Sequence, residues 1–188
     1  MQSEELSSLF LKVQKIAREV VAPTVDLDFE DVKWPEEGIR ALQKEGFGGL
    51  VVPTLYGGRG CGVLTLAKVC EILGQECAST AICFGMHCVG SSVIAANPTE
   101  AQQIDLLKPI CDGNHITTLS LSEAGTGSSF YLPQATMKEL SSEVFCINGS
   151  KTFVTNGKYA DSYVVSVVAN NDQEELGLFS CAVVAGSS

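Results

Sequence analysis

Apolar residues in the first two thirds of the chain recur every three or four positions, which is the spacing of one helix face. Pro23 ends the first such segment. Its apolar face is formed by Leu6, Leu9, Val13, Ile16 and Val20. A second segment, "WPEEGIRALQKEGFGG", has Pro35 in its first turn and Gly46 after its last, as helix ends favour. Both segments are therefore predicted to be amphipathic helices.

Three further segments continue the helical pattern, over residues 63–76, 78–96 and 99–113. The middle one, "ASTAICFGMHCVGSSVIAA", is long enough to span a membrane, but its Gly, Ser and His favour a buried core helix. His87 lies midway along it and is interpreted as a hydrogen-bonded core histidine rather than a functional one. In the last segment Thr99 is the expected N-cap, and Gly113 follows the last turn.

From about residue 115 the pattern changes to short segments rich in β-branched and aromatic residues, which favour strands. Turn signals, including Asn148-Gly149 and Asn156-Gly157, separate them. The predicted strands are "HITTLSLS", "QATMKEL", "EVFCINGS", "KTFVTNG", "DSYVVSVVA" and "LGLFSCAVVA". The order predicts an α+β fold, with an all-α domain over 1–114 followed by a small antiparallel β domain over 115–188.

Charge and cysteine usage exclude several classes of function. The formal net charge of −10 disfavours binding to nucleic acid or to an anionic membrane surface. The eight cysteines form no CxxC pair and there are two histidines, so no zinc site is expected. Cysteines inside apolar runs, together with a start that lacks a signal peptide, favour reduced thiols in a cytoplasmic or similarly reducing compartment.

Two segments could carry chemistry. "LSLSEAGTGSSF", residues 119–130, has the glycines and hydroxyls of an anion-binding loop but neither P-loop nor Rossmann spacing, and a surface turn is the alternative. "NGSKTFVTNG", residues 148–157, would place Phe153 and Thr155 on one face of a strand, where they could flank a planar cofactor. On pattern alone, a hairpin with a core Phe is favoured there. Tyr56, before Gly57-Gly58, shapes either a loop near a ligand pocket or a structural turn.

Five segments in order resemble motifs of the acyl-CoA dehydrogenase family. They are "EGFGGLVVPTLYGGRGCG", "ECASTAICFGMHCVG", "PTEAQQIDLLKPICDG", "LSLSEAGTGSS" and "INGSKTFVTNGKYAD". Three positions depart from the family's usual residues: Ala124 replaces Pro, Ser129 replaces Asp, and Phe153 stands where Trp is commonest. The resemblance implies an N-terminal helical domain and part of the middle β domain, with the family's C-terminal four-helix bundle absent.

The resemblance also implies FAD as cofactor, bound between the middle and C-terminal domains of a homo-oligomer. The Leu119–Ser122 backbone and the Ser122 hydroxyl would meet the flavin pyrimidine edge, and Phe153 would flank the isoalloxazine. The Thr155 hydroxyl would bond flavin N5, and Ser128 would also lie near the acyl-CoA. The full set of implied cofactor-binding residues is Leu119, Ser120, Leu121, Ser122, Gly127, Ser128, Phe153, Val154 and Thr155.

The implied reaction is α,β-oxidation of an acyl-CoA thioester, in which a carboxylate removes the α-proton and the β-hydride passes to flavin N5. Electrons would leave to an acceptor such as an electron-transfer flavoprotein. The general base is expected in the C-terminal region of the family enzymes, and Glu123 is expected to be structural. We therefore expect an N-terminal portion that is inactive alone. The alternative is a shortened, non-catalytic homologue that binds or assembles with a full-length flavoprotein.

Overall fold

The computed structural model describes residues 3–25, 33–141, 144–169 and 178–185. The first helix, α1 (Ser3–Ile16), continues through a π-helical turn η1 (Ala17–Val21) and a 3-10 turn η2 (Ala22–Thr24). Leu9, Val13 and Ile16 are buried, as their spacing predicts. Glu4 and Glu5 lie in the first turn and Lys15 in the last, where their charges complement the helix dipole.

Five more helical segments complete the helical layer, and they confirm the predicted helices. They are α2 (Glu36–Lys44), α3 (Val63–Glu76), α4 (Ala78–Ala96), α5 (Glu100–Gln102) with η5 (Gln103–Leu107), and α6 (Lys108–Cys111). A short 3-10 turn, η4 (Thr54–Tyr56), lies in the loop between α2 and α3. Thr99 forms a reciprocal capping box with Gln102, which fixes the start of α5.

Helix α4 is the central helix of the layer. Among the described residues it is the one helix long and apolar enough to cross a membrane. It packs against α3 on one side and against β1 on the other, and both Phe84 and Cys88 are buried in the core. Gly90 lets the helix approach β1 closely, because a Cβ there would come within 3.0 Å of the Thr118 backbone. These contacts confirm the prediction of a core helix.

Five strands form one mixed sheet: β1 (Thr117–Ser120), β2 (Thr136–Ser141), β3 (Val144–Asn148), β4 (Ser162–Ala169) and β5 (Leu178–Ala185). Strand β4 is central, antiparallel to β5 and parallel to both β1 and β2, while β2 and β3 form an antiparallel hairpin. Two of the pairings are antiparallel as predicted, but the two parallel pairings make the sheet mixed rather than antiparallel. The chain returns after β3 so that β4 starts beside the start of β1, which makes this pair parallel. The residue pattern of a strand does not indicate the direction of its partner.

The predicted strand over 151–157 does not form. This segment is a loop with positive φ at Phe153 (54°) and Asn156 (62°), and Lys158 just after it also has a positive φ (73°). Its backbone bonds to β1 and the loop after it rather than to a neighbouring strand. Of the other predicted strands, residues 143, 176 and 177 lie outside the described part of the chain.

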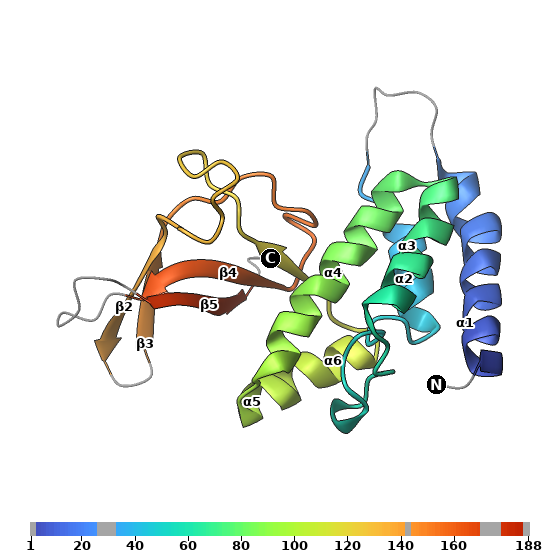
Figure 1. Cartoon of the computed structure of the whole chain (residues 1–188), viewed down its shortest axis with the longest axis horizontal. Helices are drawn as coiled ribbons and strands as arrows, with labels where there is room; N and C mark the ends of the chain where they lie inside the picture. Colours follow the sequence, from blue (N-terminus) through green and yellow to red (C-terminus); the bar gives the residue numbers. More distant parts are fainter. Residues whose placement is uncertain (1–2, 26–32, 142–143, 170–177, 186–188) are drawn as a thin grey trace.

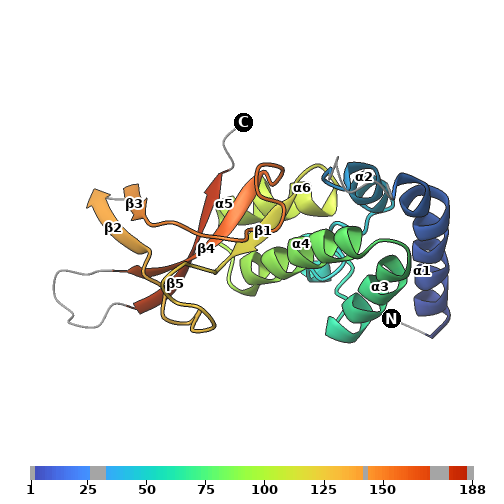
Figure 2. The ribbon, with the colours of Figure 1, turned by 90° about the horizontal axis from the view of Figure 1, so that it is seen from above.

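The helices and the sheet occupy opposite ends of an elongated molecule, and α4 lies alongside the sheet in both views (Figure 1, Figure 2). One apolar cluster, which includes Val13, Leu42 and Phe84, fills the helical layer. A second, smaller cluster includes Ile94, Ile110 and Val164, and it joins α4 and α6 to β4. The chain therefore presents its sheet on a rigid helical support.

Candidate functional site

Glu123 anchors the glycine-rich loop that follows β1. Its carboxylate is 6% exposed and accepts hydrogen bonds from the backbone N–H groups of Gln134 (2.6 Å) and Ala135 (3.0 Å). The loop therefore closes on itself, with its start pinned to its end. This carboxylate holds the loop together, which supports the expected structural role.

Lys151 is the cation that compensates this buried carboxylate. Its Nζ lies 2.7 Å from a Glu123 oxygen and also donates to the Leu121 carbonyl (3.3 Å) and to the Ser166 hydroxyl (2.9 Å). Burial opposes ionisation of Glu123, but the hydrogen bonds from Lys151, Gln134 and Ala135 outweigh it and lower the pKa of this carboxyl. Glu123 is thus a fixed carboxylate with three donors and is poorly suited to accept a substrate proton.

Two further hydrogen bonds join the candidate segments, which are about thirty residues apart in sequence. The Thr152 N–H donates to the Ser122 carbonyl at 2.8 Å. The Thr118 hydroxyl donates to the Thr155 carbonyl at 2.6 Å. Together with the Lys151 contacts, they hold the loop 119–130 and the loop 151–157 side by side. The structure therefore brings both sets of predicted site residues to one place.

Several polar groups at this place remain without a partner in the described part of the chain. The N–H groups of Gly127 and Ser128 donate no hydrogen bond, and the hydroxyls of Ser122 and Thr155 make none. Gly127 has a φ of 52°, a conformation that glycine adopts without steric cost. Strand β1 pairs with β4 on one side, and on its other edge the Thr117 N–H donates to His87 Nδ1. This arrangement can receive a ligand that has acceptors at two separated points.

Phe153 is the most unusual residue of the set. Its side chain is 97% exposed, and its φ of 54° is a costly conformation for an aromatic residue. The alternative of a core Phe in a hairpin is therefore wrong. Of the remaining predicted residues, Ser120 is buried, while Leu119, Leu121, Val154 and Thr155 are half-buried. An exposed aromatic ring is a surface on which a planar ring system can lie.

Comparisons with known proteins identify the family of the chain. The family model for the acyl-CoA dehydrogenase N-terminal domain matches residues 3–114, and that for the middle domain matches residues 118–188. The chain belongs to the acyl-CoA dehydrogenase family. A short-chain specific acyl-CoA dehydrogenase of Clostridium acetobutylicum is 29% identical over 177 residues, which are 93% of this chain and 46% of that protein. The chain thus spans about half the length of the curated relatives it matches.

Solved structures of the family share the fold. Butyryl-CoA dehydrogenase from Megasphaera elsdenii superposes with a TM-score of 0.85 at 24% identity, over 98% of this chain and 49% of that one. A complex of PigA with FAD superposes with a TM-score of 0.78 at 22% identity, again over 98% of this chain and 49% of the other. At these identities the likeness concerns the fold.

The residues present fit one side of such a dinucleotide. The unpartnered N–H groups of Gly127 and Ser128 suit a diphosphate, because consecutive backbone N–H groups form an anion-binding nest. The exposed Phe153 ring suits the face of a flavin.

No role was predicted for Lys151 from the sequence, although it belongs to the motif "INGSKTFVTNGKYAD". The signal that could have identified it is charge balance, because a glutamate that is buried for a structural reason needs a cation nearby. Asn156 was interpreted as a turn residue alone, yet its side chain is buried and makes contacts outside its own turn. No role was predicted for Trp34 from the sequence.

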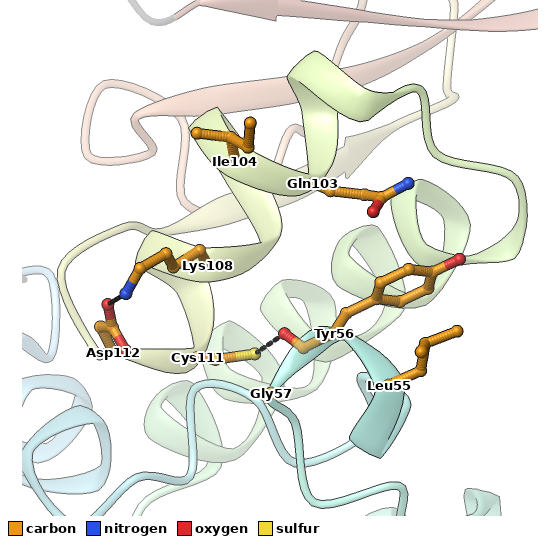
Figure 3. A pocket seen from close by; sticks show the side chains of 8 residues that line it. All are labelled: Leu55, Tyr56, Gly57, Gln103, Ile104, Lys108, Cys111 and Asp112. Carbon is orange, nitrogen blue, oxygen red and sulfur yellow. Dashed lines mark hydrogen bonds and ion pairs between the residues drawn. The ribbon is translucent and has the colours of Figure 1, made fainter.

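A separate cavity of about 370 Å³ lies in the helical layer (Figure 3). Tyr56 and Gln103 project into it from opposite walls, and Lys108 pairs with Asp112 at 2.7 Å along its side. None of the predicted flavin residues lines this cavity. The adjoining Gly57 has a φ of 87°, so its turn needs glycine for structural reasons.

Proposed function

We propose that this chain forms the helical and flavin-facing portion of an FAD-dependent acyl-CoA dehydrogenase, which oxidises the α,β-bond of an acyl-CoA thioester. One observation carries the proposal. The Glu123–Lys151 ion pair and the Thr152–Ser122 hydrogen bond join two motif segments so that an exposed aromatic ring, free hydroxyls and unpartnered N–H groups lie together. Such a collection has no role in the packing of this chain, which favours a ligand.

Each residue is assigned a role by the group it presents. The Leu119–Ser122 backbone and the Ser122 hydroxyl would meet the polar edge of the flavin, and Gly127 with Ser128 would hold the diphosphate. Phe153 would cover the ring face with Val154 beside it, and the Thr155 hydroxyl would donate to flavin N5. When bound, FAD supplies the hydride acceptor. This chain supplies orientation, because its donors are fixed by Lys151, Glu123 and Thr118 before any ligand arrives.

The general base is assigned to a part of the family enzyme outside these two domains. Glu123 is the carboxylate within the loop 119–130. It accepts hydrogen bonds from three donors and has a lowered pKa, so it suits a structural role rather than proton abstraction. We infer that the 188-residue chain turns over no acyl-CoA alone. Turnover of any acyl-CoA by the purified chain with an artificial electron acceptor would refute this.

The partners follow from the proposed reaction. Acyl-CoA is the substrate, with Ser128 near it, and an electron acceptor such as an electron-transfer flavoprotein removes the electrons. A homo-oligomer is expected, as is a reducing compartment such as the cytoplasm. The thiols whose side chains are described are all free, which suits such a compartment.

The test is the visible absorption spectrum of the purified chain before and after addition of FAD, followed by gel filtration. Flavin bands that stay with the protein peak are expected if the joined loops suffice to hold the cofactor. A Ser128→Pro variant, which removes one N–H of the anion nest, should retain less FAD. A chain that elutes colourless at every FAD concentration would contradict flavin binding by this portion.

The second candidate is a non-catalytic partner of a full-length flavoprotein. The observation that favours it is the β2–β3 hairpin, where Leu140, Val144 and Phe145 are all more than half exposed. Apolar groups in such number on one hairpin are typical of a covered surface. Comigration of the colourless chain with a purified full-length homologue in gel filtration would favour this role, and separate elution would contradict it.

A further inference from the structure

Asn156 connects the loop of Phe153 and Thr155 to the helical layer. Its side chain is 5% exposed, although it belongs to a surface loop. The amide Nδ2 donates to the Cys83 carbonyl of α4 at 2.9 Å, and the amide Oδ1 accepts from the Trp34 indole Nε1–H at 2.9 Å. In Figure 1 this loop, drawn in orange, reaches the side of α4. One side chain thus connects the candidate flavin loop to helix α4 and to Trp34, which precedes α2.

A stacked ring pair strengthens the same junction. The Trp34 indole lies parallel to the Tyr159 ring, with centroids 4.8 Å apart and planes 7° apart. The Arg40 guanidinium lies 5.9 Å from the indole centroid on the helical side. Trp34 therefore contacts the loop twice, through its N–H at Asn156 and through its face at Tyr159. This junction buries polar atoms that could otherwise be satisfied by water.

The local backbone explains why the loop needs this support. Three non-glycine residues within six positions have positive φ, namely Phe153, Asn156 and Lys158. Such a conformation costs free energy at each position and persists where surrounding contacts hold it. Asn156 also supplies its carbonyl to the N–H groups of Tyr159 and Ala160, which closes the turn. The side chain of Asn156 is thus placed to hold the conformation that exposes Phe153.

We propose that Asn156 and Trp34 are positioning residues: they fix the loop 151–160 against the helical layer and thereby present Phe153 and Thr155 to the flavin. The flavin part of this inference rests on the proposed function. The helical layer would then govern flavin affinity without touching the cofactor. Neither residue is assigned contact with FAD or with substrate.

The test compares two variants with a matched control. Asn156→Gly removes both side-chain hydrogen bonds and keeps a residue that accepts positive φ. Trp34→Phe keeps a ring for stacking and removes the indole donor. Ile110→Ala destabilises the second apolar cluster, in which no residue of the loop takes part. All three are studied in the 188-residue chain, at a temperature where urea titration shows each to be fully folded.

Trypsin reports the order of the loop without any cofactor. Lys158 is an exposed cleavage site inside the loop, and Lys138 is an exposed reference site on β2. Cleavage of a folded protein follows the population of the locally open state when reclosing is fast. Asn156→Gly is expected to raise cleavage at Lys158 relative to Lys138 by about tenfold, and Trp34→Phe by roughly threefold. Ile110→Ala should leave the ratio unchanged.

FAD affinity, read by quenching of flavin fluorescence, is the second measurement. Asn156→Gly should weaken it by about tenfold, since the bound loop conformation must then be ordered on binding. Ile110→Ala should not weaken it, whatever its loss of stability, and this separates positioning from general destabilisation. In Asn156→Gly, emission of Trp34, the sole tryptophan, should also shift toward that of a solvated indole.

The outcomes separate the two proposals. A higher Lys158 ratio with weaker FAD binding supports positioning. An unchanged ratio in both loop variants, or a raised ratio with unchanged FAD affinity, overturns it. If the unsubstituted chain binds no FAD, flavin binding by this portion fails, and the loop-fixing role is then decided by the cleavage ratio and Trp34 emission alone.

Discussion

Acidification should weaken the fold through His87, and its surroundings set the size of the effect. The ring is 2% exposed; its Nε2–H donates to the Gly48 carbonyl at 2.9 Å, and its Nδ1 accepts the Thr117 N–H at 3.2 Å. The neutral ring with its proton on Nε2 satisfies both contacts. Burial lowers the pKa of His87 to about 4 from an ordinary 6.5. A proton on Nδ1 would also face the Thr117 N–H, and repulsion between these two donors would further disfavour the charged ring.

The sign of the effect follows from this lowered pKa. Between pH 6.5 and 4 the unfolded chain binds a proton at His87 more readily than the folded chain does. The neutral His87 ring therefore contributes its full stabilisation of the folded state above pH 6.5, and this contribution is lost as the pH falls toward 4. From pH 7.5 to pH 5 the expected loss is about 2 kcal/mol, and near pH 4 it reaches about 3 kcal/mol.

The assay is urea unfolding followed by far-UV circular dichroism at pH 7.5, 6.5, 5.5 and 5, at constant ionic strength. His115, whose pKa burial also lowers, supplies the control. His115→Gln should keep most of the loss, whereas His87→Gln should be less stable at pH 7.5 and should lose most of the pH dependence. Effects of the carboxylates and of net charge are common to both variants and cancel in the comparison.

An NMR titration of the His87 ring gives an independent readout if His87→Gln does not fold. A titration midpoint near pH 6.5 for His87 in the folded chain would refute the reasoning. A buried neutral ring with both nitrogens hydrogen-bonded cannot titrate like a solvated one. A free energy of unfolding that stays constant between pH 7.5 and 5 would refute it as well.

Three further substitutions test the loops by urea unfolding. Lys151→Met leaves the Glu123 carboxylate buried without its cation and should cost about 3–5 kcal/mol, and adding Glu123→Gln should recover part of it; two additive losses would contradict the ion pair. Phe153→Ala should change stability by less than about 0.5 kcal/mol while reducing FAD retention in gel filtration; unchanged retention would contradict its role. Gly58→Ala places a methyl group onto a backbone carbonyl and should cost about 1–3 kcal/mol, whereas Gly62→Ala enters open space; equal stability of the two would contradict the close approach.

The helical layer was predictable because its apolar spacing has one physical cause, burial of one helix face. Leu9, Val13 and Ile16 of α1 are buried as predicted, and α4 is the core helix that its composition favours. Strand direction was not predictable, because β1 and β4 are rich in β-branched residues, which favour a strand in either pairing direction. The segment 151–157 has the composition of a strand, yet its contacts with β1 and α4 override that propensity.

The candidate site was predictable where a motif marks it and not where packing completes it. The loops 119–130 and 151–157 were both singled out from the sequence, and the structure joins them. Lys151, Asn156 and Trp34 were missed because their roles depend on partners far away in the chain, Trp34 by 122 positions from Asn156. The local sequence predicts the turn at Asn156-Gly157 but not the Trp34 indole that donates a hydrogen bond to Asn156.

The junction between helices and sheet explains why such distant partners matter. An interface between two layers is ordinarily apolar, and apolar contacts tolerate small sliding. Here the junction includes His87, Thr117 and Asn156, all buried and all hydrogen-bonded across it. Each polar pair is costly when its partner is displaced, so a shift of one layer would break several pairs together. The polar junction therefore fixes the position of the sheet on α4. The hydrogen bonds of Thr118 and Asn156 fix the loop 151–157 in the same position.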